Sequence, residues 1–242
     1  MKEDKKQRVR RTYHELKEGT LRAVSELSKE KELSNITMVD IGEKAGIRVD
    51  VLKRNYTSVE KILSLYAASV DYWISDLFDP KHPLDSSSEK IMIETFTRLT
   101  NELYNDREMQ KLLIWELSED NPTTRRLAAN REVFYADVFA RYNKLFKDTG
   151  LHIDIISALI NAGIYYLILH RKRSTFWGVD FSKRPEKKRL VEGIGQMVTL
   201  LFNALEKRNQ MQEVARKFKQ RGVAPDVIAD CTGLTLKEVE GL

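Results

Sequence analysis

Residues 36–56 read ITMVDIGEKAGIRVDVLKRNY. Thr37 is suited to cap a helix, because its hydroxyl can accept from a backbone N–H in the first turn, and Asp40 can accept from the cap in return. The apolar residues that follow are spaced for one face of a helix: Met38, Ile41 and Ala45. The pattern predicts a short helix that begins directly after Thr37.

A glycine turn ends this helix and leads into a second one. Gly46 stops the first helix, and Ile47 is placed to be buried in the turn. A second apolar stripe at helical spacing comes next: Val49, Leu52 and Tyr56. Two short helices joined by a tight glycine turn have the geometry of a helix-turn-helix, in which the first helix braces the second against the major groove of DNA.

These residues carry a family resemblance. From residue 11 to about residue 75 the chain resembles the DNA-binding end of tetracycline-repressor (TetR) family regulators. The shared features are a long first helix, the segment Ile-Thr-Met-x-Asp-Ile-x-Glu-Lys-Ala-Gly-Ile, a second short helix ending in an aromatic residue, and Ser58-x-Glu60 at the start of a long fourth helix. The match stays in register through residues 36–56, and it implies the family's fold.

The resemblance also implies which residues contact DNA. They lie on the second short helix, its flanks and two helix starts: Thr37, Arg48, Val49, Asp50, Lys53, Arg54, Asn55, Tyr56 and Ser58. Arg, Lys and Asn side chains suit phosphates and base edges, and a hydroxyl at a helix start can donate to a phosphate. We therefore expect this segment to bind double-stranded operator DNA.

The chain also departs from the family pattern. The family usually has alanine where Gly42 stands, a serine-like cap at Arg48, tyrosine and then histidine or tyrosine at Lys53 and Asn55, and lysine at Val59. Each change removes a typical DNA contact or a helix-stabilising feature. Loss of an N-cap costs on the order of 1 kcal/mol of helix stability, so the second short helix is expected to be loosely held unless DNA orders it.

Composition sets outer bounds on the function. The chain has 242 residues, enough for a small and a larger domain, and a formal net charge of +5 at pH 7. Its single cysteine, Cys231, excludes an intramolecular disulfide and favours a reducing cytoplasm, and we expect it to be a small core residue. No apolar leader opens the chain, so we expect no signal peptide and a cytoplasmic protein.

Cations are concentrated at the N-terminus. Residues 1–11 contain only two acids, Glu3 and Asp4, and six basic residues: Lys2, Lys5, Lys6, Arg8, Arg10 and Arg11. This arm is either a solvated, disordered terminus or a phosphate-binding arm beside the helix-turn-helix, and the sequence favours neither.

Helical spacing recurs along the whole chain and predicts an all-α protein. The expected parts are an N-terminal three-helix helix-turn-helix DNA-binding domain over 1–57, a helical effector-binding and dimerisation domain over 58–210, and a short helical C-terminal extension over 211–242. The first helix is expected over about 11–29, and the fourth from Thr57 or Ser58 to about Leu77. A proline-containing turn over 79–88 follows.

Residues 153–169 are apolar on nearly every side. A bilayer span needs about 20 predominantly apolar residues, and this run is shorter and interrupted by polar residues, so we expect no membrane partner. One face should instead meet the core and another a partner. Together with a helix over about 185–208, the resemblance implies a homodimer through the helices near 153–170 and 185–208.

A run of cations lies between those two helices. It reads His170-Arg171-Lys172-Arg173, then Trp177, then Lys183-Arg184 and Lys187-Lys188-Arg189. Cations at a helix end complement the helix dipole, which is the simpler interpretation. A second nucleic-acid patch is the alternative.

The C-terminal extension resembles a second helix-turn-helix over residues 227–239, with Gly233 in its turn. Its second helix is under two turns long, because the sequence ends at Leu242. We therefore expect the extension to pack against the domain or its dimer mate, with DNA contact as the lesser alternative.

No catalytic constellation stands out in the sequence. The four histidines are scattered without metal-ligand spacing, and there is no glycine-rich phosphate loop or nucleophile elbow. We predict neither an enzyme nor a metal or cofactor site. The resemblance implies an effector pocket instead, with these candidates: Trp73, Phe96, Tyr104, Trp115, Phe134, Tyr135, Tyr165 and Tyr166. Aromatic residues at helical spacing more often fill a core, so each has a structural alternative.

Two functions remain. The first is a dimeric TetR-like transcriptional regulator, a repressor that a small, mainly apolar effector releases from operator DNA. The second is a helical dimeric ligand-binding or interaction protein that keeps the fold and has lost sequence-specific DNA binding. The departures from the family pattern motivate the second.

Overall fold

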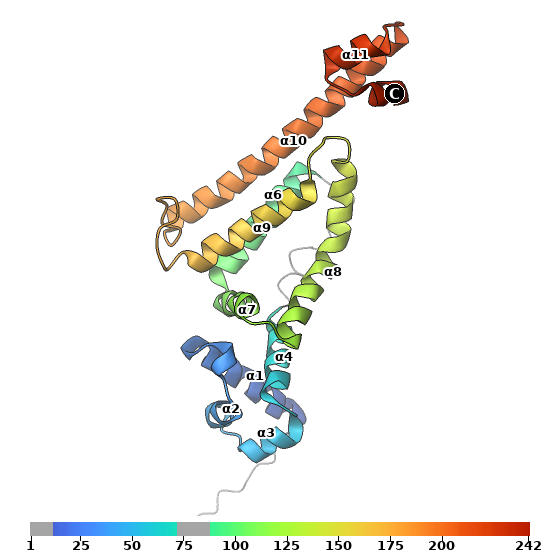
Figure 1. Ribbon diagram of the computed structural model, residues 1–242. Helices are drawn as coiled ribbons and strands as arrows, with labels where there is room; N and C mark the ends of the chain where they lie inside the picture. Colours follow the sequence, from blue (N-terminus) through green and yellow to red (C-terminus); the bar gives the residue numbers. More distant parts are fainter. Residues whose placement is uncertain (1–11, 72–87) are drawn as a thin grey trace, which may run out of the picture. The chain divides into compact units, whose positions relative to one another are not determined.

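The computed structural model describes residues 12–71 and 88–242. Within these ranges every regular element is a helix, and extended residues meet only in the isolated bridge between Phe176 and Val179. The fold class is all-α, as predicted (Figure 1). The basic N-terminal arm, the pocket candidate Trp73 and the turn over 79–87 lie outside the described residues.

The chain divides into two compact units. The N-terminal unit contains described residues 12–71 and 102–134, and the C-terminal unit contains 88–101 and 135–242. Helices α6 (Glu89–Asn105) and α8 (Pro122–Leu145) therefore contribute residues to both units. No boundary falls between residues 57 and 58, because α4 (Val59–Val70) and α7 (Arg107–Ser118) pack together with α1 (Tyr13–Glu30) in one unit.

Helix α1 is the element that the other N-terminal helices share. It contacts α2 (Met38–Ala45), α4 and α7. Thr12 and Glu15 form a capping box at its start. Its buried face consists of these residues: Leu16, Thr20, Ala23, Val24, Leu27 and Ser28. The 3-10 helix η1 (Leu33–Asn35) then leads into α2.

A buried ion network ties α8 to α7 and to the end of α4 within the N-terminal unit. The Arg131 guanidinium lies 3.3 Å from an Asp71 carboxylate oxygen and pairs with both carboxylate oxygens of Glu116. The three side chains are 6%, 9% and 17% exposed. Charges this far from water depend on each other, because an unpaired one would keep its full desolvation penalty.

The C-terminal unit is built around α9 (Ile153–His170) and α10 (Arg184–Gln220). Phe202 on α10 meets Phe146 and Tyr142 edge-on, at ring-centroid distances of 5.2 and 6.5 Å. Thr199 donates a hydrogen bond to Glu89 on α6. These contacts join α6, α8 and α10 within the unit.

Helix α10 is longer than the sequence predicted. We expected it to end near Arg208, but it continues to Gln220, so the expected boundary between 210 and 211 falls inside the helix. The reason is that no glycine or proline stands between Gln196 and Gln220. The turn at Gly222, with φ of 78°, ends it.

The C-terminal extension has a small core of its own. It comprises α11 (Pro225–Thr232) and α12 (Leu236–Gly241) folded onto the last turns of α10. The fully buried members of this core are Ala215, Ile228, Leu234 and Val239. Packing against the chain's own α10 agrees with the expected role of the extension. Cys231 is exposed, so its prediction as a core residue is wrong.

Candidate nucleic-acid interface

Helix α2 begins with the predicted capping box. Thr37 Oγ1 accepts from the Asp40 N–H at 3.2 Å, and Asp40 Oδ2 accepts from the Thr37 N–H at 2.8 Å. Lys31 also contacts this carboxylate, at 2.7 Å. The Lys31 ammonium and the Thr37 hydrogen bonds lower the pKa of Asp40 to about 2. Lys44, at the other end of α2, pairs with Glu30 on α1, so ion pairs hold both ends of α2.

The turn after α2 depends on two glycines. Gly46 ends the helix with φ of 60°, in the left-handed region, as predicted. The Ile47 N–H then donates to the Gly42 carbonyl at 2.8 Å. A Cβ on Gly42 would lie 2.7 Å from the Ile47 carbonyl oxygen and 3.3 Å from Val49 Cγ2. Only glycine therefore permits this close approach, a requirement that the sequence signalled by a glycine inside a short helix.

Helix α3 (Val49–Asn55) has one buried and one exposed side. Leu52 is fully buried, and Ile47 and Tyr56 are 7% and 3% exposed. The Tyr56 side chain, a predicted DNA contact, is thus part of the core. The other predicted contacts of this segment reach solvent, with Val49 half-buried: Arg48, Asp50, Lys53, Arg54 and Asn55. The exposed side presents three cations and an amide on one short helix and its N-cap.

Asp50 holds two of these cations. Arg48 Nε lies 2.7 Å from Asp50 Oδ1, and Arg54 Nη2 lies 3.5 Å from Asp50 Oδ2. The Arg48 guanidinium, and to a lesser extent that of Arg54, lowers the pKa of Asp50. Asn55 Nδ2 donates to the Val51 carbonyl at 2.8 Å. Lys53 makes no ion pair with any residue in 12–71 or 88–242.

The helix starts are occupied in two different ways. Thr37 Oγ1 donates to Asp40 Oδ2 at 2.7 Å, and Ser58 Oγ accepts from the Lys61 N–H at 3.2 Å, so both predicted hydroxyls act as helix caps. Arg48, the N-cap of α3, makes no side-chain capping bond. The first N–H groups of α3 therefore lack the side-chain acceptor that α2 and α4 have.

The aromatic pocket candidates are spread over both units. Tyr104 and Trp115 belong to the N-terminal unit, and Phe96, Tyr135, Tyr165 and Tyr166 belong to the C-terminal unit. Phe96, Trp115 and Tyr135 are buried, whereas Tyr166 is 49% exposed. The side chain of Phe134 lies outside the described part of the structure. Buried aromatics of this kind are equally consistent with core packing, the alternative noted above.

An open groove lies elsewhere, between α1, α4 and the start of α7. Its volume is about 500 Å³, and Ser25, Tyr66 and Glu108 help to line it, but none of the aromatic candidates does. Ser25 donates a hydrogen bond to Glu108 across the groove. Burial raises the pKa of the Tyr66 hydroxyl to about 12. A groove of this volume is large enough for a small ligand.

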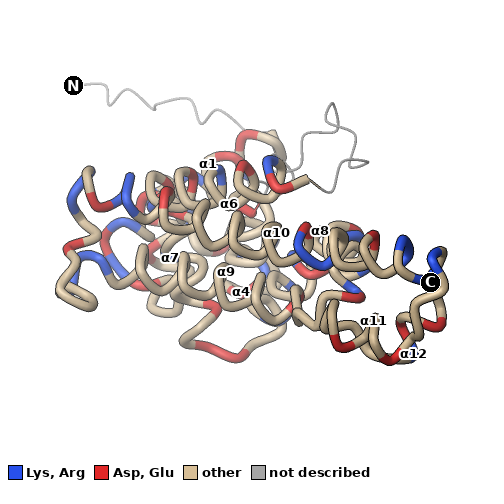
Figure 2. Tube along the Cα trace, turned by 90° about the horizontal axis from the view of Figure 1, so that it is seen from above, with Lys and Arg blue, Asp and Glu red and all other residues tan. Residues whose placement is uncertain are grey.

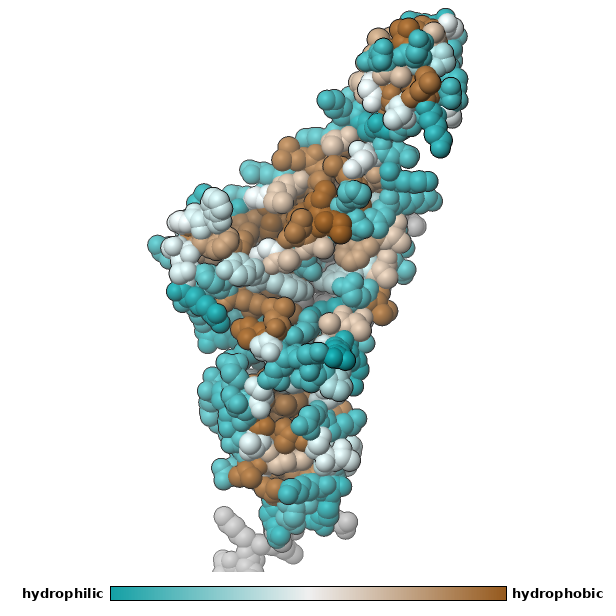
Figure 3. All heavy atoms as spheres, viewed as in Figure 1, coloured by the Kyte–Doolittle hydropathy of each residue, from teal (hydrophilic) through white to brown (hydrophobic). Residues whose placement is uncertain are grey.

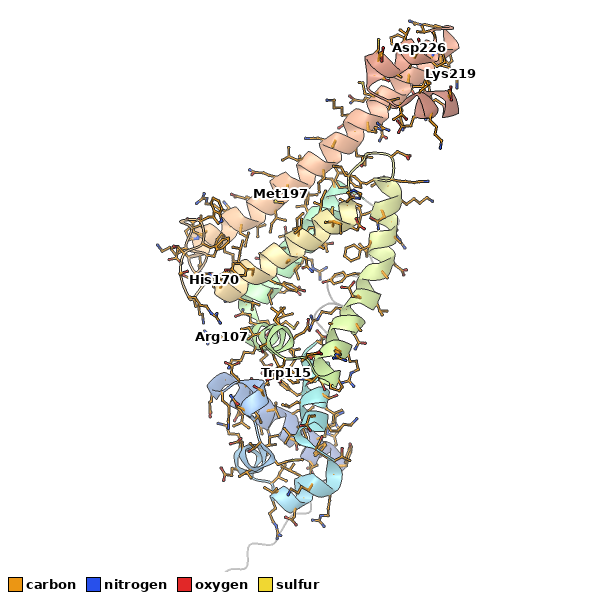
Figure 4. All side chains as sticks on the ribbon, viewed as in Figure 1. Arg107, Trp115, His170, Met197, Lys219 and Asp226 are labelled. Carbon is orange, nitrogen blue, oxygen red and sulfur yellow. The ribbon has the colours of Figure 1, made fainter. Side chains whose placement is uncertain are left out.

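A second surface feature is an apolar face on α9 and α10. Large apolar side chains reach solvent at helical spacing, between 48% and 67% exposed: Ile155, Leu159 and Tyr166 on α9, and Met197 and Leu200 on α10. Figure 3 shows hydrophobic residues gathered over these helices, and Met197 can be followed on α10 in Figure 4. By length and composition alone α9 could cross a membrane, and 28% of its 18-residue window is buried.

Helix α12, the second helix of the extension, is poorly suited to DNA. Thr235 and Glu238 form its capping box, and Glu238 pairs with Arg208. Glu240 adds another carboxylate, so the short helix carries one lysine, Lys237, against two acids. A helix of this charge repels phosphates.

No group of three or more His, Cys, Asp and Glu side chains is placed to hold a metal ion among residues 12–71 and 88–242. Searches of protein-family models and of curated proteins find no match to the chain.

Proposed function

We propose that the chain is a dimeric, TetR-like DNA-binding transcriptional regulator. The observation that carries the proposal is the exposed side of α3, with Arg48, Lys53 and Arg54 presented by a helix whose other side is locked into a core. Arg and Lys side chains fixed on one helix are the groups that bind phosphates and guanine edges.

The bracing of α3 supports the proposal further. Helix α2 is clamped to α1 by Lys44 and Glu30, and the turn from α2 to α3 is held by the Ile47 N–H and the Gly42 carbonyl. A reading helix needs such a scaffold, because base contacts are lost when the helix shifts in the groove. In this proposal α2 positions α3, and α3 enters the major groove.

The apolar face on α9 and α10 supports a homodimer. Contiguous exposed apolar patches on a soluble chain mark interaction surfaces, and a second copy buries the same patch symmetrically. Two reading helices in a symmetric dimer would contact half-sites about 34 Å apart on a palindromic operator. Repression, and release by a small, mainly apolar effector, complete the proposal and rest on the family resemblance alone.

The test is to select DNA fragments bound by the purified chain from a random pool near physiological salt, and to titrate the winner. The expected winner is a palindrome bound about a thousandfold or more tightly than random DNA. Uniform weak binding that disappears with salt would contradict sequence-specific recognition.

Matched variants then assign the residues. Arg48→Ala and Lys53→Ala should each weaken binding to the selected fragment, while the paired surface changes Lys144→Ala and Lys147→Ala on and after α8 should leave it unchanged. A phosphate contact reduces the salt slope by about one, whereas a base contact relaxes sequence preference. Full retention of binding by the Arg48→Ala, Lys53→Ala double variant would remove α3 from the interface.

A second candidate is a dimeric ligand-binding or interaction protein that has lost sequence-specific DNA binding. The pairing of Arg48 and Arg54 with Asp50 favours it, because a carboxylate in the centre of the reading side repels phosphates. The fragment selection separates the two candidates, since this one predicts a dimer without a preferred DNA sequence.

A further inference from the structure

The loop between α9 and α10 concentrates the positive charge of the chain. Residues 170–192 contain eight lysines and arginines and three acids, so with neutral histidine their formal charge is +5, as large as that of the whole chain. Lys and Arg residues can be followed in Figure 2 at the end where α9 joins α10. The helix dipole explains cations at the end of α9, but α10 begins in the same loop, where its dipole favours anions.

The tip of this loop is a tight two-residue turn. The Phe176 N–H donates to the Val179 carbonyl at 2.9 Å, and the Val179 N–H donates back at 3.0 Å. Trp177 and Gly178 both have positive φ, 50° and 75°, as a type I′ turn requires. Asn-Gly is the preferred pair for this turn, and Trp177 is the one residue other than glycine with positive φ in the described ranges.

Packing at the base of the turn holds it in place. The Phe176 ring meets Tyr166 and His170 on α9 edge-on, at 5.1 and 6.1 Å, and those two rings stack on each other at 5.2 Å. Trp177 itself is 91% exposed. A large aromatic residue thus occupies a strained backbone position without any packing inside the chain in return, which points to a contact outside it.

Residues 170–192 contain more lysines and arginines than acids that could pair with them. All three acids of the segment are in ion pairs: Asp180 with Lys183, Glu186 with Arg189, and Glu192 with Lys188. Burial lowers the pKa of Lys187, and the charges of Arg171 and Arg184 lower it further. Since cations already repel each other here, a second copy of the same loop is an unfavourable partner and an anionic one is favourable.

We propose that the Trp177 turn is a peripheral contact to an anionic lipid bilayer. The indole enters the headgroup region, where amphipathic tryptophan rings are most stable. The exposed cations of the loop bind lipid phosphates: Lys172, Arg173, Lys183, Arg184, Lys188 and Arg189. Clusters of four to eight Lys and Arg beside an apolar anchor are typical of such binding. A projecting turn suits a flat surface, whereas stacked bases need a groove that tracks their backbone.

This contact differs from a membrane span. It concerns the loop alone, leaves α9 in the C-terminal unit, and is independent of the function proposed for α3. Two weak anchors, one apolar and one electrostatic, give reversible attachment. The sequence-based expectation was that the chain has no membrane partner, and the proposal departs from that expectation.

The test is co-sedimentation of the full chain with vesicles of phosphatidylcholine alone or mixed with phosphatidylglycerol. We expect binding to the mixed vesicles only, and loss of it at high salt. The fluorescence of Trp177 should shift to the blue on binding. Trp177→Asn is the decisive variant, because asparagine suits a type I′ turn and should preserve folding. It should weaken vesicle binding about tenfold or more and abolish the fluorescence shift.

Charge variants separate the two anchors. Lys172→Glu with Arg173→Glu should reduce binding to the mixed vesicles, and Lys144→Glu with Lys147→Glu, an equal change of net charge elsewhere, should reduce it much less. The proposal is overturned if the chain binds neither vesicle, binds both equally, or binds equally well with Trp177→Asn. It is also overturned if single-stranded DNA or an acidic peptide binds the loop and mixed vesicles do not.

Discussion

At the scale of single residues, the exposed side of α3 is governed by one carboxylate. Asp50 holds Arg48 and Arg54 while Lys53 remains available. The spacing of Val49, Leu52 and Tyr56 predicted the apolar side of α3, because apolar residues three and four positions apart share one face of a helix. Tyr56, which was also predicted to contact DNA, lies on this buried side. The pairing of Arg48 and Arg54 with Asp50 was not predicted. Arg48 reaches Asp50 from the N-cap, where the backbone is extended and helical spacing does not apply.

Asp50→Asn should strengthen DNA binding. The change releases both guanidiniums and removes a negative charge that faces phosphates, so the affinity for the selected fragment should rise and the salt slope should steepen by about one. Titration by fluorescence anisotropy at several salt concentrations measures both. Glu43→Gln, which removes an exposed acid from α2, is the control and should have a smaller effect. Unchanged affinity in Asp50→Asn would place Asp50 outside the interface.

Gly42→Ala should destabilise the chain although alanine is the better helix former. The added Cβ would sit 2.7 Å from the Ile47 carbonyl oxygen, and overpacking of this kind costs about 1–3 kcal/mol, more than the roughly 1 kcal/mol that alanine gains in a helix. Urea unfolding measures the difference. Gly193→Ala in α10, where the Cβ meets open space, should be neutral or stabilising. Equal effects of the two changes would contradict the close approach at Gly42.

The Asp40 carboxylate should make stability depend on acid pH. Its folded pKa of about 2 lies below the ordinary value of 3.8, so its contribution is present above pH 3.8 and is lost as the pH falls from 3.8 towards 2. The difference in unfolding free energy between the natural chain and Asp40→Asn should therefore shrink across that window. A difference that stays constant from neutral pH to pH 2 would show that the carboxylate charge is unimportant.

At the scale of elements, helix caps with a local sequence signal were predicted more accurately than the length of α10. Thr37, Ser58 and Gly46 each act by local hydrogen bonding or backbone geometry, so a few neighbouring residues suffice to place them. Besides the absence of glycine and proline before Gln220, the continuation of α10 is supported by the core that the extension builds on its last turns, which involves residues beyond the helix such as Ile228 and Val239. Such tertiary support is invisible to periodicity alone.

The ion network that joins three elements should be costly to break. Arg131→Ala leaves the Asp71 and Glu116 carboxylates largely buried without their shared cation, and removal of one partner from such a group costs about 3–5 kcal/mol. Arg125→Ala removes an exposed pair with Asp120 that water and salt screen, so it should cost much less. Denaturant midpoints of the two variants test this directly. Similar midpoints would show that water reaches the Arg131 network.

At the scale of the whole molecule, the predicted all-α class is confirmed, and α9 and α10 carry exposed apolar residues. The aromatic residues predicted to line one pocket are instead divided between the two units. The sequence indicated that residues 153–169 have a second apolar face, and the structure leaves Ile155 and Leu159 exposed. It could not place the aromatic candidates, because spacing reveals that a ring points inward without revealing which unit it enters. Tyr104 and Tyr135 accordingly fall in different units.

The apolar face should be required for self-association. Leu159→Glu with Leu200→Glu places charges in the centre of the face, so the chain should become monomeric and lose its cooperative binding to a palindrome. Analytical ultracentrifugation measures the mass. Leu117→Glu, a change at a 74% exposed leucine on α7, is the control and should leave the mass unchanged. A natural chain that is already monomeric at micromolar concentration would contradict the dimer.

The Arg48–Asp50 pair has a consequence for target search. A genome contains about a million or more competing nonspecific sites, so a regulator that binds all phosphates equally tightly is mostly bound to nonspecific DNA. An arginine that must first break its ion pair with a carboxylate gains little binding free energy from a nonspecific phosphate contact. It gains most where it can also form hydrogen bonds to a base edge. If α3 reads DNA as proposed, the acid in its first turn would shorten residence on random sequence and keep more molecules free to find the operator.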